Sequence, residues 1–178
     1  MKTMWAKYAD LAARRYAVSP DGDRMALTVG GFFQVMGKEA GRDAGWKMHV
    51  SVAAEDVPAA WDLLYPFLES EGIACVKVAS PGTVRKLSAS AGHPQRGKMI
   101  TVYADARPRA WAELAARMEG MLRGAGIRPG PEVAGDSRMF GSRYLSFRND
   151  HDAAGNYVDA RKAQKNDYAP TPFCGRRS

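Results

Sequence analysis

The sequence predicts a single domain of the α+β class, in which helices pack on one face of an antiparallel-rich sheet. Two strand-helix-strand units follow one another along the chain of 178 residues, over 46–79 and 98–148. Their strands alternate apolar and polar side chains, which is the pattern of a sheet with one covered and one open face. Apolar residues make up 46% of the chain and charged residues 25%, so the composition is that of an ordinary globular protein.

The N-terminal residues 1–24 are predicted to form a short helix and a turn. Apolar residues recur at helical spacing from Trp5 to Ala12, and the turn signal Ser-Pro-Asp-Gly at 19–22 ends the pattern. Residues 25–36 are apolar and are expected to form one strand with a bend at Gly30 and Gly31. A polar loop then runs from 37 to 45.

The first unit begins with a strand over 46–53 and continues with a helix over 55–70. Asp56 can cap this helix, Pro58 suits its first turn, and the apolar residues between 60 and 68 form one stripe. Gly72 ends the helix, and a strand over 73–79 completes the unit.

A short helix over 83–90 and a Gly-rich, basic loop over 91–97 connect the two units. The second unit consists of a strand over 98–104, a helix over 107–124 and a strand over 143–148. The domain is therefore expected to span 25–150. Residues 151–178 form a polar extension, which is expected to be helical near 157–165 and disordered at its end.

The formal net charge of +7 favours an anionic partner. A phosphorylated peptide fits this charge as well as nucleic acid does, and the missing RNP-like strand, Cys/His finger and basic heptad argue against nucleic acid. A solvated basic surface is the simpler explanation for part of the excess. No apolar run approaches the roughly 18 residues of a membrane span, and residues 1–18 lack the apolar region of a signal peptide.

The two cysteines, Cys75 and Cys174, do not form a disulfide framework. The chain contains no CxxC or HxxxH spacing, so we expect neither zinc nor another metal.

Lys47 and His49 are the first candidates for a functional site. They lie two residues apart in a strand-like run, so they share one strand face with Ser51, while Met48 and Val50 share the other. The apolar face suits a core. An ammonium group beside an imidazole suits the binding of a phosphate and the transfer of a proton. The alternative is an exposed strand face on which any polar residue would serve.

Lys77 is the second candidate. It stands between Val76 and Val78 and points with Cys75 away from the core side of its strand. Partial burial beside other cations would lower its pKa from about 10.4 towards neutrality, and a neutral amine can act as a general base. The alternative is a lysine at a sheet edge whose ammonium group extends into solvent.

Arg96, Lys98, Tyr103 and Arg148 form the third group. Arg96 lies in a loop just before a strand, where it could swing onto an anion. Guanidinium groups grip phosphate oxygens in a fork and position a phosphoryl group better than lysine can. Taken singly, each member could equally be a surface cation or a half-buried tyrosine.

In this order, these segments resemble the phosphothreonine lyases, which are effectors delivered by bacterial type III secretion. The matching stretches are Lys-Met-His-Val-Ser-Val at 47–52, Val-Lys-Val at 76–78, Ile-Thr-Val-Tyr at 100–103 and Tyr-Leu-Ser-Phe-Arg-Asn at 144–149. Gly-Phe-Phe at 31–33 and Asp136, twelve residues before Arg148, also resemble the family. The lyase domains of lanthipeptide synthetases are a related group, with a similar Lys-x-His strand and a late strand that carries arginine.

The resemblance implies an enzyme that removes phosphate from phosphothreonine or phosphoserine by β-elimination, without water, metal or cofactor. Lys77 would be the base that takes the Cα proton, and His49 the acid that protonates the leaving phosphate oxygen. Lys47 would stabilise the enolate that develops on the substrate carbonyl. Tyr103 would form a hydrogen bond near the base or the phosphate.

The resemblance also implies the groups that bind the substrate and the kind of partner. Arg148, Arg96 and Lys98 would hold the phosphate, and Arg161 is the nearest candidate for the last arginine of the family. The substrate would be a phosphorylated peptide or protein, either the activation loop of a host kinase or a lanthipeptide-type precursor peptide.

The competing function is a non-catalytic binder of phosphopeptides or nucleic acid that uses the same basic face. We expect a monomer that is made in the bacterial cytoplasm without a signal peptide and does not act on a membrane. If it is of the effector type, type III secretion would then carry it into a host cell.

Overall fold

One antiparallel sheet of eight strands forms the centre of the fold. The computed structural model describes residues 17–18, 24–29, 31–37, 46–73, 75–89, 91–103, 108–139 and 141–150. Its strands are β1 (Ala17–Val18), β2 (Arg24–Val29), β3 (Phe32–Gly37), β4 (Trp46–Val50), β5 (Cys75–Ala79), β6 (Ile100–Tyr103), β7 (Ser137–Arg138) and β8 (Leu145–Asn149). Its helices are the 3-10 helix η1 (Ala54–Asp56) and the α-helices α2 (Val57–Ser70), α3 (Pro81–Ala89) and α4 (Pro108–Gly124).

The strands follow the order β1-β2-β3-β5-β6-β4-β8-β7, and each neighbouring pair is antiparallel. In the unit β4-α2-β5 the two strands run parallel and enclose β6, while in β6-α4-β8 they enclose β4. Each unit therefore places one strand between the two strands of the other, which is the split βαβ arrangement. The hairpin of β2 and β3 extends the sheet beyond β5.

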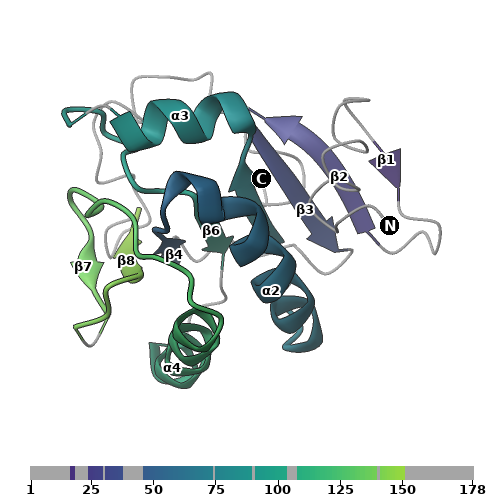
Figure 1. The fold of residues 1–178 in the computed structure, drawn as a ribbon. Coiled ribbons are helices and arrows are strands. Elements are labelled where there is room, and N and C mark those ends of the chain that lie inside the picture. The colour runs from purple at the N-terminus through teal and green to yellow at the C-terminus, as the bar shows by residue number, and fades with distance from the viewer. Residues whose placement is uncertain are drawn as a thin grey trace.

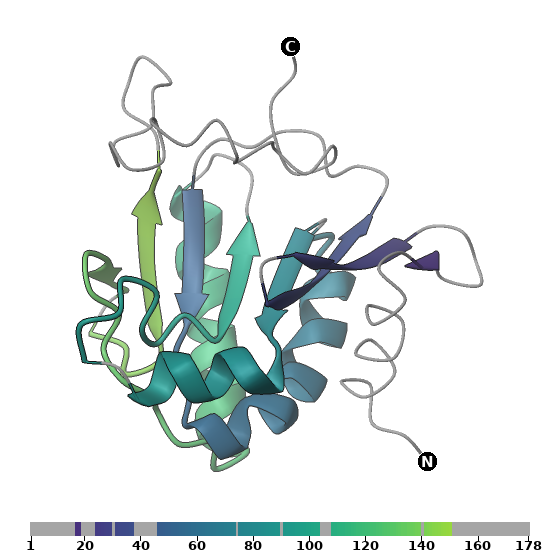
Figure 2. The ribbon, with the colours of Figure 1, turned by 90° about the horizontal axis from the view of Figure 1, so that it is seen from above.

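Helices α2 and α4 cover the same face of the sheet and contact each other (Figure 1). Figure 2 shows both helices behind the central strands, with α3 across one end of the sheet. The apolar stripe of α2 includes Trp61 and Leu64, and that of α4 includes Met118 and Leu122; all four side chains are buried. The opposite face of the sheet is left uncovered by α2 and α4.

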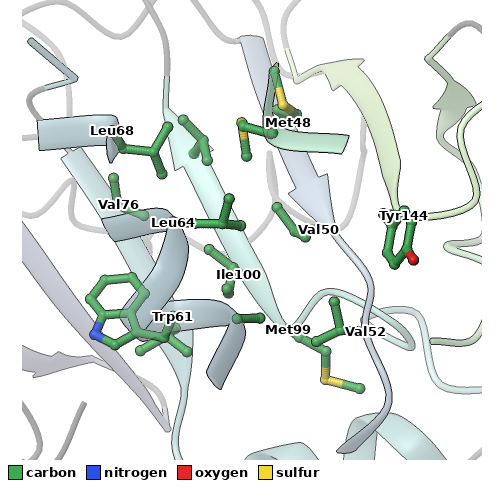
Figure 3. Packing of buried hydrophobic residues seen from close by; sticks show 14 of the residues in the cluster. Met48, Val50, Val52, Trp61, Leu64, Leu68, Val76, Met99, Ile100 and Tyr144 are labelled. Carbon is green, nitrogen blue, oxygen red and sulfur yellow. The ribbon is translucent and has the colours of Figure 1, made fainter. Parts of the chain in front are cut away.

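The hydrophobic core lies between the sheet and these helices (Figure 3). Met48 and Val50 of β4 pack there with Val76 of β5 and Ile100 of β6, opposite residues of α2 such as Leu64. Burial of one such side chain contributes about 1.5–3 kcal/mol. Because strand side chains alternate, a slip of one residue would turn this whole set away from the core. The core therefore fixes which residues of β4, β5 and β6 face the other side.

The predicted fold class is confirmed, and the described α-helices begin and end close to their expected bounds. Helix α3 starts at Pro81, two residues before its expected start. Ser80 explains the difference, because its Oγ lies 3.4 Å from the backbone nitrogen of Thr83, in the position of an N-cap. Pro81 then occupies the first helical position, where its missing N–H is tolerated.

Residues 25–36 form two strands, and the expectation of one bent strand was wrong. Strands β2 and β3 pair from Met25 and Met36 to Val29 and Phe32 as a hairpin. Gly31 has a φ of +84°, and a Cβ at this position would lie 2.3 Å from the Oγ1 of Thr83. A Gly-Gly pair marks both a bent strand and a hairpin turn, so the local pattern did not separate the two.

Of the predicted N-terminal helix and turn over 1–24, the structure describes residues 17–18 and 24, which belong to β1 and β2. The rest of this segment lies outside the described residues, as does the extension over 151–178 with its expected helix near 157–165.

Candidate active site

The strand register places polar side chains in two rows on the face of the sheet opposite to α2 and α4. The first row crosses β3, β5, β6, β4 and β8 and consists of Gln34, Lys77, Thr101, His49 and Ser146. The second row lies two residues further along β6, β4 and β8 and consists of Tyr103, Lys47 and Arg148. Between the two rows lie residues whose side chains face the core, among them Val76, Val102 and Met48.

His49 and Lys77, the expected acid and base, belong to the same row. Thr101 is the register partner of both, so a single strand separates them. Neighbouring strands are about 4.8 Å apart, which puts the two Cα atoms about 10 Å from each other. Two side chains that flank one strand on the same face can reach a bound group from opposite sides.

Two ammonium groups share the ring of Tyr103. Lys47 Nζ lies 5.4 Å and Lys77 Nζ 5.7 Å from the centroid of this ring. Lys77 Nζ also lies 4.5 Å from the centroid of the Phe32 ring. Cations within about 6 Å of an aromatic face are attracted by the ring quadrupole. The two rings thus hold two lysine ammonium groups in one region of this face.

His49 is held by a carboxylate from the segment that precedes β7. Its Nδ1 lies 2.6 Å from Oδ2 of Asp136, and the Oγ of Ser146 donates a hydrogen bond of 2.8 Å to the same oxygen. The His49 side chain is 3% exposed and that of Asp136 0%. With Nδ1 bound to Asp136, Nε2 is the ring nitrogen that remains for a substrate.

Burial lowers the pKa of His49 to about 4, because the charged imidazolium loses its hydration. The hydrogen bond and charge of Asp136 oppose this shift, and the charges of Lys98 and Arg148 add to it. Burial acts to raise the pKa of Asp136, but the bonds from His49 and Ser146 outweigh it, and the net shift is downward. At neutral pH the pair is therefore a neutral imidazole that donates its Nδ1–H to an ionised carboxylate.

Asp150 directly follows β8 and bridges two cations of the second row. Its Oδ2 accepts a hydrogen bond from Lys47 Nζ, and its Oδ1 lies 2.9 Å from Nε of Arg148. The Asp150 side chain is 4% exposed, whereas that of Arg148 is 22% exposed. Arg148 Nε also lies 3.9 Å from Oδ1 of Asp136. One guanidinium group thus stands between two carboxylates.

Two loops close over the end of β4. Ser51 Oγ donates a hydrogen bond of 2.6 Å to the carbonyl oxygen of Pro131. Gly97 has a φ of +77°, and a Cβ there would lie 2.5 Å from the same carbonyl oxygen. Only glycine permits this approach, which brings the basic loop 91–97 against the segment that carries Asp136.

Arg96 lies in this loop, and Lys98 directly follows it. Lys98 is buried, and its charge lowers the pKa of both His49 and Asp136. Arg96 is half-buried in the turn before β6, and among the described residues its buried Nε has no hydrogen-bond partner. A buried guanidinium nitrogen of this kind fits an anionic ligand.

The structure brings together most of the residues that the sequence singled out. Those on the face opposite to α2 and α4 are Lys47, His49, Lys77, Tyr103 and Arg148. Lys98 lies within electrostatic reach of His49, whereas no described contact joins Arg96 to this group. Arg161 and His151 lie outside the described residues.

Three further residues complete the site, and the sequence patterns gave them no role in it. The sequence indicates Asp136 only through the family resemblance, because 87 residues separate it from His49 and no local pattern links the two. Ser146 and Asp150 each stand two residues from Arg148, and this spacing was a usable signal that both share its side of the strand.

In the described ranges, no group of three or more His, Cys, Asp and Glu side chains is arranged to hold a metal ion. None of the helices in the same ranges is long and apolar enough to cross a membrane. The chemistry available at this site consists of lysine and arginine side chains, the carboxylates of Asp136 and Asp150, and one imidazole with a fixed tautomer. Such a set can bind a dianion and move protons next to it.

A family model described as the N-terminal domain of RamC matches residues 14–170. Among solved structures, the type III effector and phosphothreonine lyase OspF from Shigella flexneri has a TM-score of 0.61 and 23% identity, covering 80% of this chain and 76% of that chain. The phosphothreonine lyase SpvC from Salmonella has a TM-score of 0.62 and 22% identity, covering 80% of this chain and 74% of that chain. The phosphothreonine lyase effector VirA (SpvC) from Chromobacterium violaceum has a TM-score of 0.59 and 22% identity, covering 75% of this chain and 67% of that chain. These likenesses establish a shared fold. A search of curated proteins found no match.

Proposed function

This chain belongs to the family of the RamC N-terminal domain, and from that premise we propose that it removes phosphate from phosphothreonine or phosphoserine by β-elimination. The fold that it shares with phosphothreonine lyases supports the proposal. The observation that carries it is the common row of His49 and Lys77, one strand apart on the uncovered face. An elimination needs a base and an acid on either side of one phosphoester, and this row offers both.

In the proposed reaction, the neutral amine of Lys77 takes the proton from the Cα of the phosphorylated residue. The electron pair of that C–H bond forms the Cα–Cβ double bond, and the Cβ–O bond breaks. His49 gives a proton to the leaving phosphate oxygen. The products are a dehydroamino acid and inorganic phosphate, so atoms and charges balance without water or an oxidant.

The remaining residues have supporting roles in the proposal. Lys47 stabilises the enolate that develops when the Cα proton leaves, and Tyr103, whose ring both lysines approach, forms a hydrogen bond near the base or the phosphate. Arg148 binds the phosphate with Arg96 and Lys98. Arg161 is kept as a further candidate for this role.

The charge states set a condition on this mechanism. In the free protein burial lowers the pKa of His49 to about 4, so the imidazole is neutral when the substrate arrives. A phosphate dianion at Nε2 would favour the imidazolium and supply the proton donor only in the complex. Lys77 has to be neutral at the same moment in order to act as the base.

The test is to incubate the protein with a phosphothreonine peptide and weigh the product. Elimination removes the elements of phosphoric acid, whereas hydrolysis leaves the free hydroxyl. The proposal predicts the first product and a Lys77→Met variant that binds the peptide but forms none. Recovery of threonine would exclude the elimination.

A non-catalytic binder is the second candidate, because the same positive face would bind phosphopeptides or nucleic acid. It predicts salt-sensitive binding, no product with any substrate, and only slightly weaker binding after Lys77→Met. Within the elimination, two substrate classes fit the chemistry: a phosphorylated host kinase, reached through secretion, and a precursor peptide in the bacterial cytoplasm. Assaying one phosphopeptide of each class separates them.

A further inference from the structure

The bridge formed by Asp150 occupies the cations that the proposed reaction needs for its substrate. Oδ2 of this carboxylate accepts a hydrogen bond from Lys47, and Oδ1 lies 2.9 Å from Arg148 Nε in an ion pair without hydrogen-bond geometry. The side chain is 4% exposed, so its charge interacts with these cations with little screening by water. A substrate anion can reach Lys47 and Arg148 only if Asp150 moves away or shares them.

Asp136 does not compete in the same way. Its Oδ2 already accepts bonds from His49 and Ser146, and its side chain is fully buried. Its Oδ1 has no hydrogen-bond partner among the described residues and lies 3.9 Å from Arg148 Nε. The charge of Asp136 therefore stays near Arg148 when Asp150 exchanges with another anion.

The exchange favours one class of anion over others. A phosphomonoester carries a charge of about −1.5 to −2 at neutral pH and has three strong acceptor oxygens. The carboxylate of a peptide glutamate carries −1 and has two oxygens, which is no more than Asp150 already provides. Replacing Asp150 by a phosphate dianion therefore gains charge and hydrogen bonds, whereas replacing it by a carboxylate gains neither.

We propose that Asp150 is an internal competitor for the anion site, which raises the intrinsic affinity that an anion needs in order to bind there. It neutralises Lys47 and Arg148 in the free protein, gives way to a phosphomonoester dianion, and excludes acidic side chains. This inference rests on the proposed function, since it concerns the same anion site. Asp150 lowers the apparent affinity for every anion by the same factor, which a tightly bound phosphomonoester dianion tolerates and a weakly bound carboxylate does not.

The experiment measures binding, so that it does not depend on turnover. The probes are a peptide with the phosphonate analogue of phosphothreonine, in which carbon replaces the bridging oxygen and blocks elimination, and the same peptide with glutamate at that position. Calorimetry on the full chain compares wild type with Asp150→Asn and Asp150→Ser. If Asp150 holds the cations in about nine of ten free molecules, both variants bind the phosphonate about tenfold more tightly. The glutamate peptide gains by the same factor, so the ratio of the two affinities stays unchanged while the weakly bound glutamate peptide becomes measurable.

Asp56→Asn is the matched control, because Asp56 also pairs with an arginine, Arg128, but on the surface away from the site. This variant should bind both peptides like wild type. Unchanged or weaker phosphonate binding in Asp150→Asn and Asp150→Ser would overturn the inference, since Asp150 would then be a positioning residue for Lys47 and Arg148. If wild type converts a phosphothreonine peptide, such a result leaves the proposed function intact. If wild type converts no phosphopeptide, the proposed function itself fails.

Discussion

Replacing His49 by asparagine should remove a large part of the pH dependence of the free energy of unfolding. In the folded protein burial lowers the pKa of His49 to about 4, from its usual value of 6.5. Between these two values the unfolded chain binds a proton at this position and the folded chain does not. Lowering the pH therefore favours unfolding, and the stability that is fully present above 6.5 is lost as the pH falls towards 4.

The magnitude follows from the shift of the pKa. One pKa unit corresponds to about 1.4 kcal/mol, so the whole shift is worth roughly 3 kcal/mol, and roughly 2 kcal/mol of it is lost by about pH 5. Asparagine does not titrate, and its amide can still donate a hydrogen bond to Asp136 in place of Nδ1–H. The variant should be less sensitive to acid than wild type by this amount.

Urea denaturation of both proteins at several pH values between about 7.5 and 5 measures the effect. The difference between the two curves isolates the contribution of His49 together with that of Asp136, whose pKa His49 lowers. Parallel curves with a constant offset would refute the reasoning, because they would mean that His49 has the same pKa in the folded and unfolded states. In that case the imidazole would not be buried and neutral in the free protein.

Three other measurements test the site and the packing of the loops around it. Asp136→Asn should reduce kcat for the phosphopeptide roughly 10²-fold, because an amide no longer selects the Nδ1–H tautomer of His49, and a kcat close to wild type in steady-state kinetics would contradict this. Binding of the phosphonate peptide near neutral pH should take up a proton, so its calorimetric enthalpy should vary with the ionisation enthalpy of the buffer; no such variation would mean that His49 stays neutral. Gly130→Ala should cost about 1–3 kcal/mol in denaturant unfolding, since its Cβ would lie 2.4 Å from the carbonyl oxygen of Val52. Gly120→Ala, with open space around the Cβ, serves as the control and should be neutral or stabilising.

Local periodicity was sufficient to place several side chains of the site. The alternation in β4 put Lys47 and His49 on one face and Met48 and Val50 on the other, and the register of the sheet agrees with this. The same argument turned Lys77 away from the core. These predictions succeed because each strand buries one face, and burial of apolar side chains outweighs any preference of a single polar residue.

The local sequence pattern did not predict the structure where two kinds of backbone turn have the same residue signal. It also did not predict contacts between residues that are far apart in the chain. The pair Gly30 and Gly31 marks a turn, but only the pairing of β2 with β3 makes it a hairpin. The order of the strands in the sheet could not be predicted from the local pattern either. The sequence pattern did not reveal that β6 lies between β4 and β5, which is what places Lys77 one strand from His49.

The amino-acid sequence alone specifies an α+β domain whose strands carry amines, an imidazole and guanidinium groups on the face opposite to the helices. It can do so because the alternation of side chains depends only on residues that are neighbours in the chain. The charge state of those groups is decided by contacts that form only when distant segments pack. Asp136 reaches His49 across 87 residues, and Asp150 reaches Lys47 across 103. Burial and charge then set whether the imidazole is neutral and whether the cations are already occupied, and both depend on packing in three dimensions.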